Sequence, residues 1–298
     1  VGSEMCIRDR WKYCMLCSTL KKDLNSGATL VAPGVHDMIS AILAEKIGFS
    51  AIFVGGYGIS ASHLGVPDVG IMTFTDVLDR VRMISEVTTK PLIVDADTGY
   101  GGLINLRHAV RNFEKVGVAA IQIEDQVFPK RCGHAKGIKV VTIEEMSTRI
   151  NVAIDSRMSE DFLIIARTDC RPELGLDEAI KRAEAYTKAG ADLIFVESPQ
   201  NVKEMEKLRK SIDAPLVFKM VPDGKLSDLD SKVLADMGFN LLIYPSLGFL
   251  SAADAMQRAF TELKNTGLVK KQSLQSFADF SEMIGFDEIY SFEKRWEN

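Results

Sequence analysis

Short apolar runs recur along the chain, each bounded by turn residues and followed by a segment with helical spacing. The runs are rich in Ile, Val, Leu and Phe without alternation, which is typical of strands buried on both faces of a sheet. Eight such runs occur, at residues 29–34, 51–56, 91–97, 120–125, 162–169, 192–198, 215–220 and 241–246. Three of the helical segments between them end on Gly48, Gly117 and Gly190, as expected of glycine at a helix C-terminus.

Eight strand–helix units predict a closed (β/α)8 barrel of the TIM type. A doubly wound open sheet is the alternative, but eight units fill the length of the chain and leave nothing for a second domain. We expect a single barrel domain over residues 11–298, with residues 1–10 as a non-native leader. From about residue 268 the sequence is helical and rich in Phe and Ile. We expect this C-terminal extension to pack on the outside of the barrel or to swap between subunits.

The composition excludes several classes of function. A formal net charge of −5 over 298 residues argues against a nucleic-acid-binding surface. No apolar run reaches the roughly 18 residues that a membrane helix requires, so we expect no membrane partner. Five cysteines, an odd number without secretory features, favour a reducing compartment, and we expect a cytoplasmic protein. Cys14 and Cys17 form a C-x-x-C pair, but nothing nearby completes a zinc site.

Charged side chains lie at the ends of the predicted strands, where the catalytic groups of such a barrel are found. Asp95 and Asp97 end the third strand and alternate along it, so both are expected on the same side, near Glu124 at the end of the fourth. Unpaired carboxylates at one rim would repel each other, and oxygen ligands suit Mg²⁺ or Mn²⁺ better than Zn²⁺. The alternative is that the carboxylates form salt bridges with nearby basic residues. These basic residues are Lys130, Arg167 and Lys219.

Two loops indicate a small anionic substrate. Gly55 and Gly56, after the second strand, allow backbone N–H groups to approach an anion closely. Arg167 can bind a carboxylate through two hydrogen bonds.

The loop after the fourth strand, "PKRCGHAKG", places Cys132 beside basic residues and close to His134. From the residues alone, this thiol is a reactive acid or nucleophile, a metal ligand or an ordinary loop cysteine.

The segments "PLIVDADTGYGG", "IQIEDQVFPKRCGH", "IIARTD" and "VPDVG" resemble the isocitrate lyase/phosphoenolpyruvate mutase superfamily. The resemblance runs from about Leu16 to the C-terminus, and its specific feature is the C-G-H loop combined with D-x-D on the third strand. It implies a (β/α)8 barrel that binds Mg²⁺, with Mn²⁺ as an alternative. It also implies a homotetramer in which C-terminal helices swap between subunits, which would cover the apolar extension.

The resemblance implies roles for individual residues. Asp95 and Asp97 match the metal-site aspartates, and Asp68 and Glu124 complete the metal shell largely through water. Cys132 matches the catalytic cysteine of the carbon–carbon lyase branch. The positions that match substrate-contacting residues are Gly55, Gly56, Tyr57, Gly133, Arg167 and Glu197.

The reaction implied by the resemblance is a retro-aldol cleavage of a substituted malate, a 2-hydroxy di- or tricarboxylate. One product is a 2-oxo acid such as pyruvate or glyoxylate, and the other fragment leaves as a carbanion that Cys132 protonates. A thiol with its ordinary pKa of roughly 8.5 is mostly protonated at neutral pH, which suits a proton donor. Lys130, Arg131 and His134 would stabilise the thiolate left behind. Tyr57 or a metal-bound hydroxide is the candidate base for the hydroxyl proton.

Departures from the family pattern bear on the substrate. Lys219 stands where many members carry Asn, Gly55 where they carry Ser, and Leu250 where methylisocitrate lyases carry Arg. Loss of that arginine indicates one fewer substrate carboxylate, although Lys219 can replace the charge and bind substrate. We therefore expect a 2,3-dimethylmalate-like substrate. The alternatives are 2-methylisocitrate lyase proper, an oxaloacetate hydrolase or decarboxylase, a phosphonate mutase or hydrolase, and a non-catalytic barrel that binds a dicarboxylate.

Overall fold

Eight parallel strands form a closed barrel, in which each strand pairs with the next and the last pairs with the first. The computed structural model describes residues 16–133, 137–222, 224–269 and 274–297. The strands are β1 (Leu30–Val35), β2 (Ile52–Val54), β3 (Leu92–Asp95), β4 (Val118–Glu124), β5 (Leu163–Thr168), β6 (Leu193–Val196), β7 (Leu216–Lys219) and β8 (Leu241–Tyr244). Each of the eight predicted runs overlaps one of these strands, and the predicted barrel is confirmed over the open sheet.

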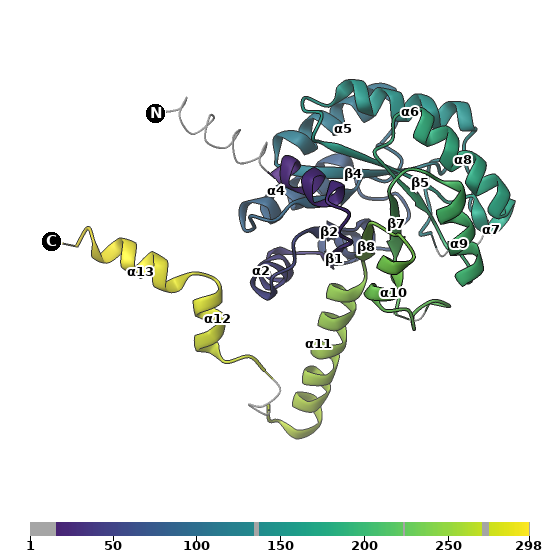
Figure 1. Ribbon diagram of the computed structural model, residues 1–298. Coiled ribbons are helices and arrows are strands. Elements are labelled where there is room, and N and C mark those ends of the chain that lie inside the picture. Colours follow the sequence, from purple (N-terminus) through teal and green to yellow (C-terminus); the bar gives the residue numbers. More distant parts are fainter. Residues whose placement is uncertain (1–15, 134–136, 223, 270–273, 298) are drawn as a thin grey trace. The chain divides into compact units, whose positions relative to one another are not determined.

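Helices connect consecutive strands and lie outside the ring of strands (Figure 1). In the barrel unit they are α2 (Met38–Ile47), α3 (Gly56–Ile59), the π-helix η1 (Ser60–Leu64), α4 (Phe74–Glu86), α5 (Leu103–Lys115), α6 (Ile143–Ser156), α7 (Arg171–Leu174), α8 (Leu176–Lys188), α9 (Val202–Ser211) and α10 (Ser231–Asp236). Residues 16–25 are also helical. No helix within the described ranges is both long enough and apolar enough to cross a membrane.

The helix ends follow from local sequence. The side chains of Asp37 and Ser40 form a capping box at the start of α2, satisfying N–H groups that have no partner within the helix. Gly48 ends the same helix with φ of 101°, and Gly117 and Gly190, just beyond α5 and α8, have φ of 89° and 99°. These left-handed values are accessible to glycine at little cost, so the predicted stops are confirmed.

The strands carry apolar side chains below the rim and charged ones at it. All seven residues of β4 are buried, and the apolar part of the strand ends at Glu124. Asp95 ends β3 in the same way, and Arg167 lies one residue before the end of β5. Because all strands run parallel, these ends meet at one edge of the barrel. The closed sheet therefore collects its charged groups on one rim above an apolar core.

The chain divides into two compact units, Val1–Gly248 and Phe249–Asn298. The second contains most of α11 (Leu247–Thr266), together with α12 (Phe277–Met283) and α13 (Phe286–Lys294). Many of its large apolar side chains are exposed, including Phe260, Leu263, Phe277, Ile289, Phe292 and Trp296. The packing of these helices on the barrel or on another subunit stays a prediction, and residues 1–10 lie outside the described part of the chain.

Candidate active site

One half of the rim brings Asp68, Asp97 and Lys130 together. The Nζ atom of Lys130 lies 2.5 Å from Asp68 Oδ1 and 2.6 Å from Asp97 Oδ1, and only 3% of the lysine is exposed. The Oδ1 atom of Asp95 accepts a hydrogen bond from the backbone N–H of Asp97, at 3.2 Å. The expected alternation of Asp95 and Asp97 along one strand is wrong, because β3 ends at Asp95 and Asp97 has a left-handed φ of 49°. The turn after β3, rather than the pleat of the strand, directs Asp97 into the site.

The charges in this half do not cancel. Burial, together with the charges of Asp95 and Asp68, raises the pKa of Asp97 to about 6 despite the opposing effect of Lys130. Burial also raises the pKa of Glu124 well above its usual range. Burial alone would lower the pKa of Lys130, but the surrounding carboxylates outweigh it and raise that pKa. Three aspartates thus surround one lysine, Glu124 is shared between Lys130 and Arg167, and a further cation would be stabilised here.

These carboxyl groups fit a hard divalent cation. Asp68 and Asp97 already direct oxygen atoms at one cation, the ammonium group of Lys130. The buried Oε1 atom of Glu124 has no hydrogen-bond partner among the described residues. In the same part of the chain, no group of three or more His, Cys, Asp or Glu side chains is arranged to hold a metal ion directly. The carboxylate oxygens therefore suit Mg²⁺ whose coordination shell is completed by water molecules. The salt bridges that the alternative interpretation predicted are also formed.

Tyr100 is a site residue that the sequence analysis missed. Its buried Oη atom has no hydrogen-bond partner among the described residues, and its ring lies 5.4 Å from that of Phe74 and 6.2 Å from that of Phe113. Burial raises the pKa of Tyr100 well above its usual range, and the charges of Asp97 and Asp95 add to the shift. Its φ of 62° is unusual for an aromatic residue. A phenol donor held in this way can hydrogen-bond a water molecule beside the carboxylates.

The other half of the rim is built around Arg167. Its guanidinium lies 3.3 Å from Glu124 Oε2, 2.7 Å from Asp169 Oδ1 and 3.8 Å from Glu197 Oε2. The Nζ atom of Lys219 lies 2.6 Å from Glu197 Oε1. Burial alone would raise the pKa of Glu197, but Lys219 and Arg167 outweigh it and lower that pKa to about 2. In this half, the cations of Arg167 and Lys219 face the carboxylates of Asp169 and Glu197. Glu124 is shared with the first half of the rim.

The loop between β4 and α6 is held closed at its base. The backbone N–H of Val127 donates to the carbonyl of Lys139 at 2.8 Å. The side-chain amide of Gln126 makes two hydrogen bonds to the backbone of Arg131, donating at 2.9 Å and accepting at 2.8 Å. These contacts fix the backbone immediately before Cys132, whose side chain is partly exposed.

Gly133 brings this loop against the second half of the rim. A Cβ atom at this position would lie 2.3 Å from Arg167 Nη2 and 3.2 Å from Glu197 Cδ, so a larger residue would displace the guanidinium. Lys130, on the same loop, reaches the first half. Cys132 therefore lies on a segment that touches both halves of the rim. His134, expected to assist Cys132, lies outside the described residues.

The predicted glycine-rich loop borders the first half. A Cβ atom on Gly56 would lie 3.4 Å from Asp97 Oδ1 and 3.5 Å from Lys130 Nζ, so the α3 backbone lies directly beside the carboxylates. Gly55 is the residue before the first turn of α3. Tyr57 is 48% exposed, on the same short helix. The structure thus brings Gly55 and Gly56 to the expected side of the site.

Behind the rim, Asp125 organises the end of β5. Its Oδ2 atom accepts hydrogen bonds from Thr168 Oγ1 at 2.7 Å, Tyr186 Oη at 2.7 Å and Arg182 Nη1 at 3.0 Å. Its Oδ1 atom accepts from the backbone N–H of Asp169 at 2.9 Å. One buried carboxylate thereby ties β4 to β5 and α8, and fixes the backbone beside Arg167. The partners of Asp125 are distant in sequence, so residue spacing does not predict them.

Comparison with known proteins places the chain in a family. Residues 20–264 match the family model described as phosphoenolpyruvate phosphomutase. The chain belongs to the phosphoenolpyruvate phosphomutase family. It is 41% identical to 2,3-dimethylmalate lyase of Eubacterium barkeri over 279 residues, covering 93% of this chain and 96% of that protein. It is 37% identical to 2-methylisocitrate lyase of Bacillus subtilis over 278 residues, covering 93% and 91%.

Solved structures of family members agree with the fold. A crystal structure of 2,3-dimethylmalate lyase, described as a member of the PEP mutase/isocitrate lyase superfamily, matches with a TM-score of 0.89 and 33% identity, covering 94% of this chain and 95% of that one. Phosphonopyruvate hydrolase, solved in complex with oxalate and Mg²⁺, matches with a TM-score of 0.86 and 31% identity over 94% and 98% of the chains. The predicted superfamily is confirmed. Because relatives over nine-tenths of the chain are named lyases, the prediction of an enzyme of this class is confirmed as well.

Proposed function

We propose that this chain is a Mg²⁺-dependent lyase that cleaves a C–C bond of a substituted malate. The products are a 2-oxo acid, such as pyruvate or glyoxylate, and a second carboxylic acid. The observation that carries the proposal is the loop from Lys130 to Gly133, which contacts the carboxylate-rich half of the rim at one end and Arg167 at the other. The similarity to 2,3-dimethylmalate lyase supports a substituted malate over other substrates of the family.

The carboxylate-rich half would hold the metal ion. Asp68, Asp95, Asp97 and Glu124 supply only oxygen donors, and their charge exceeds that of Lys130. Mg²⁺ bound there, or Mn²⁺ in its place, would act as a Lewis acid toward the hydroxyl and carboxylate oxygens of the substrate. The backbone at Gly56 lies beside these groups. Gly55, Gly56 and Tyr57 would contact the part of the substrate that becomes the 2-oxo acid.

Cys132 would donate a proton in the second half of the reaction. When the C–C bond breaks, its electron pair remains on the carbon of the leaving acid, and the hydroxyl proton passes to a base. Tyr57 is the candidate for that base among the described side chains. The Sγ–H proton of Cys132 then adds to the carbanion, and the nearby ammonium group of Lys130 stabilises the resulting thiolate. No oxidation or reduction is involved.

Arg167 and Lys219 would bind the carboxylate of the leaving acid. Arg167 is buried and Lys219 is partly buried, both contact Glu197, and Arg167 also contacts the proposed metal-site residue Glu124. Glu197, charged across the neutral pH range, holds these two cations in place. Donors fixed in position and shielded from water stabilise a developing carboxylate dianion more than mobile ones do.

Replacement of Cys132 tests the proposed mechanism. Cys132→Ser should lower turnover by about two to four orders of magnitude, since a proton donor contributes that much. Thermal stabilisation by Mg²⁺ with pyruvate should be unchanged, because neither the carboxylates nor Arg167 is altered. Cys170→Ser is the matched control, because Cys170 is buried and burial raises its pKa to about 11. Turnover per folded molecule should survive in the control; unchanged turnover in Cys132→Ser contradicts the mechanism.

A substrate panel tests the activity itself. Release of a 2-oxo acid would be followed in the presence of Mg²⁺ with 2,3-dimethylmalate, 2-methylisocitrate, oxaloacetate and phosphonopyruvate. We expect pyruvate from dimethylmalate at the highest kcat/KM. A preference for methylisocitrate would make the chain a methylisocitrate lyase. Thermal stabilisation by these acids without any turnover would instead support a non-catalytic binding protein.

We also propose that the chain assembles as a homotetramer by exchange of C-terminal helices. The support is the set of exposed aromatic and aliphatic side chains on α11 to α13, including Phe277 and Trp296. Light scattering after size exclusion should give four times the 32.9 kDa of one chain. Phe277→Ser together with Trp296→Ser should lower that mass, and a monomer in the unmodified protein would contradict the proposal.

A further inference from the structure

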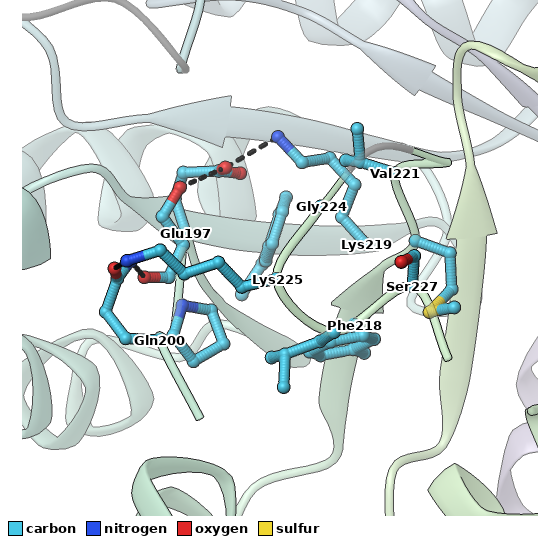
Figure 2. A pocket seen from close by; sticks show the side chains of 13 residues that line it. Glu197, Gln200, Phe218, Lys219, Val221, Gly224, Lys225 and Ser227 are labelled. Carbon is cyan, nitrogen blue, oxygen red and sulfur yellow. Dashed lines mark hydrogen bonds and ion pairs between the residues drawn. The ribbon is translucent and has the colours of Figure 1, made fainter. Parts of the chain in front are cut away.

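A pocket of about 260 Å³ lies where β6 and β7 end, beneath the connection from β7 to α10 (Figure 2). Its apolar lining consists of Phe195, Pro199, Phe218, Met220, Val221 and Leu226. A water molecule takes about 30 Å³, so the pocket has room for several carbon atoms, well beyond a single methyl group. None of the functions considered so far uses this space.

The pocket shares a wall with the candidate active site. Glu197 and Lys219 line it, and their ion pair of 2.6 Å lies along one side in Figure 2. The same Glu197 carboxylate lies 3.8 Å from Arg167 and is approached by the backbone at Gly133. The pocket therefore begins where the acid fragment would lie, next to the carbon that Cys132 protonates.

The charges of the lining favour an uncharged group. The ammonium of Lys219 is paired with Glu197 and is also assigned to the carboxylate of the acid fragment, so it leaves no cation for a second anion inside the pocket. Lys225 is exposed and its Nζ lies 2.5 Å from the side-chain oxygen of Gln200. Its charge is thus at the outer edge, while the interior is formed by aromatic and aliphatic side chains. Alkyl groups gain from leaving water for such a surface.

We propose that this pocket binds an alkyl substituent on carbon 3 of the substrate. The inference rests on the proposed function and specifies its substrate: a 2-methylmalate whose carbon 3 carries a chain longer than methyl. Cleavage breaks the bond between carbons 2 and 3, carbon 3 keeps the electron pair and receives the Cys132 proton, and the hydroxyl proton goes to the base. The products are pyruvate and an unbranched carboxylic acid of up to about six carbon atoms, the length that the pocket volume accommodates.

Binding of the product acids tests the pocket without turnover. Thermal shift and calorimetry with Mg²⁺ and pyruvate would compare acetate, propionate, butanoate, pentanoate and hexanoate. Affinity should rise about fourfold for each methylene up to hexanoate, as expected for apolar transfer. Ser227→Leu, which narrows the pocket, should abolish the rise. Asp228→Leu is the matched control, because Asp228 is exposed and does not line the pocket.

Measurement of kcat/KM provides the second test of the pocket. We expect kcat/KM for 3-propyl-2-methylmalate to exceed that for 2,3-dimethylmalate by about fifteenfold, from two added methylenes. Ser227→Leu should reverse the order while Asp228→Leu keeps it. A preference for a carboxymethyl group at carbon 3, lost in Lys225→Gln, would overturn the alkyl assignment.

The two arms separate this inference from the proposed function. If the acids bind with rising affinity but no 2-oxo acid is released from any malate, the alkyl pocket stands and the lyase proposal fails. If pyruvate is released but neither acid affinity nor kcat/KM depends on chain length, the lyase proposal stands and the pocket assignment is overturned.

Discussion

The two halves of the rim differ in their balance of charge. In the β2–β4 half, Lys130 is surrounded by the carboxyl groups of Asp68, Asp95, Asp97 and Glu124. In the β5–β7 half, ion pairs join Arg167 and Lys219 to Asp169 and Glu197. The first half is short of positive charge and would gain from a metal ion, whereas the second is neutralised by its own side chains. The contrast supports a division of labour in which one half binds metal and the other binds the acid fragment.

Removal of a metal-side carboxylate should have the largest effect. Asp97→Asn reduces the negative charge around Lys130 and removes a proposed ligand. Turnover should fall by about three orders of magnitude, since a metal Lewis acid contributes several kcal/mol. The Mg²⁺-dependent rise in Tm should also vanish, which calorimetry checks independently. Asp79→Asn, on the exposed face of α4, is the control and should leave both quantities as they are. If Mg²⁺ still raises the Tm of Asp97→Asn, the proposal that this half of the rim binds the metal ion is contradicted.

Breaking the ion pair in the other half should destabilise the fold. Lys219→Met leaves the buried Glu197 with a 3.8 Å contact to Arg167 and a hydrogen bond from the Ser198 hydroxyl. Loss of one partner from a buried pair costs about 3–5 kcal/mol, measurable by urea unfolding. Adding Glu197→Gln should restore part of that stability, because no unpaired charge then remains. If the double variant is no more stable than Lys219→Met, then Lys219 does not stabilise the fold by neutralising the charge of Glu197.

The same pair predicts an acid dependence. The pKa of Glu197 falls from 4.5 to about 2 in the folded protein, so its stabilising effect is complete above pH 4.5 and is lost as pH falls toward 2. Unfolding followed over this interval should show a steeper loss of stability in the unmodified protein than in Lys219→Met. Equal slopes would contradict a depressed pKa for Glu197.

Two glycines allow the halves to be compared by the same substitution. Gly133→Ala places a Cβ atom 2.3 Å from Arg167 Nη2, whereas in Gly56→Ala the nearest atom, Asp97 Oδ1, lies at 3.4 Å. Displacement of the guanidinium should lower kcat/KM by about a hundredfold, as small misplacements of substrate-binding groups do. Gly56→Ala should have the smaller effect. The reverse order would mean that the metal side is packed more tightly than the structure indicates.

Tyr100→Phe should have the smallest effect. It removes a buried phenol oxygen that has no hydrogen-bond partner among the described residues, so the free energy of unfolding should change little. Mg²⁺ affinity should fall about tenfold if the phenol holds a water molecule of the metal shell, as supporting hydrogen bonds commonly contribute. Unchanged affinity, measured by calorimetry, would limit Tyr100 to packing against Phe74 and Phe113.

Much of the barrel was predictable because both faces of each strand are buried. Such strands are continuous apolar runs, and each of the eight runs overlaps a strand. The C-terminal end of β3 was harder to predict from the sequence. "DAD" looks like the end of a strand, but contacts with β4 and the left-handed φ of Asp97 end the regular pairing at Asp95. That conformation depends on neighbours distant in sequence and has no local signature.

Site residues were easier to predict than their partners. The D-x-D and C-G-H segments indicate their chemistry, and Tyr100, in the same "DADTGYGG" segment, could have been found from its position. The contacts of Lys130 with Asp68 and Asp97 join three separate loops, so spacing could not reveal them. The pocket beside Lys219 likewise depends on the path of a loop whose sequence has no distinctive pattern.

The connection from β7 to α10 offers a route for protein engineering. Strand β7 pairs with its neighbours through Leu216–Lys219, and the backbone N–H of Met220 donates one more hydrogen bond to the carbonyl of Ile243 in β8. The pocket-forming residues from Val221 onward take no part in the ladder. A library that varies the length and composition of this segment could therefore retune chain-length selectivity without redesign of the barrel. Asp230, which caps α10, marks the natural point at which an exchanged segment should rejoin the scaffold.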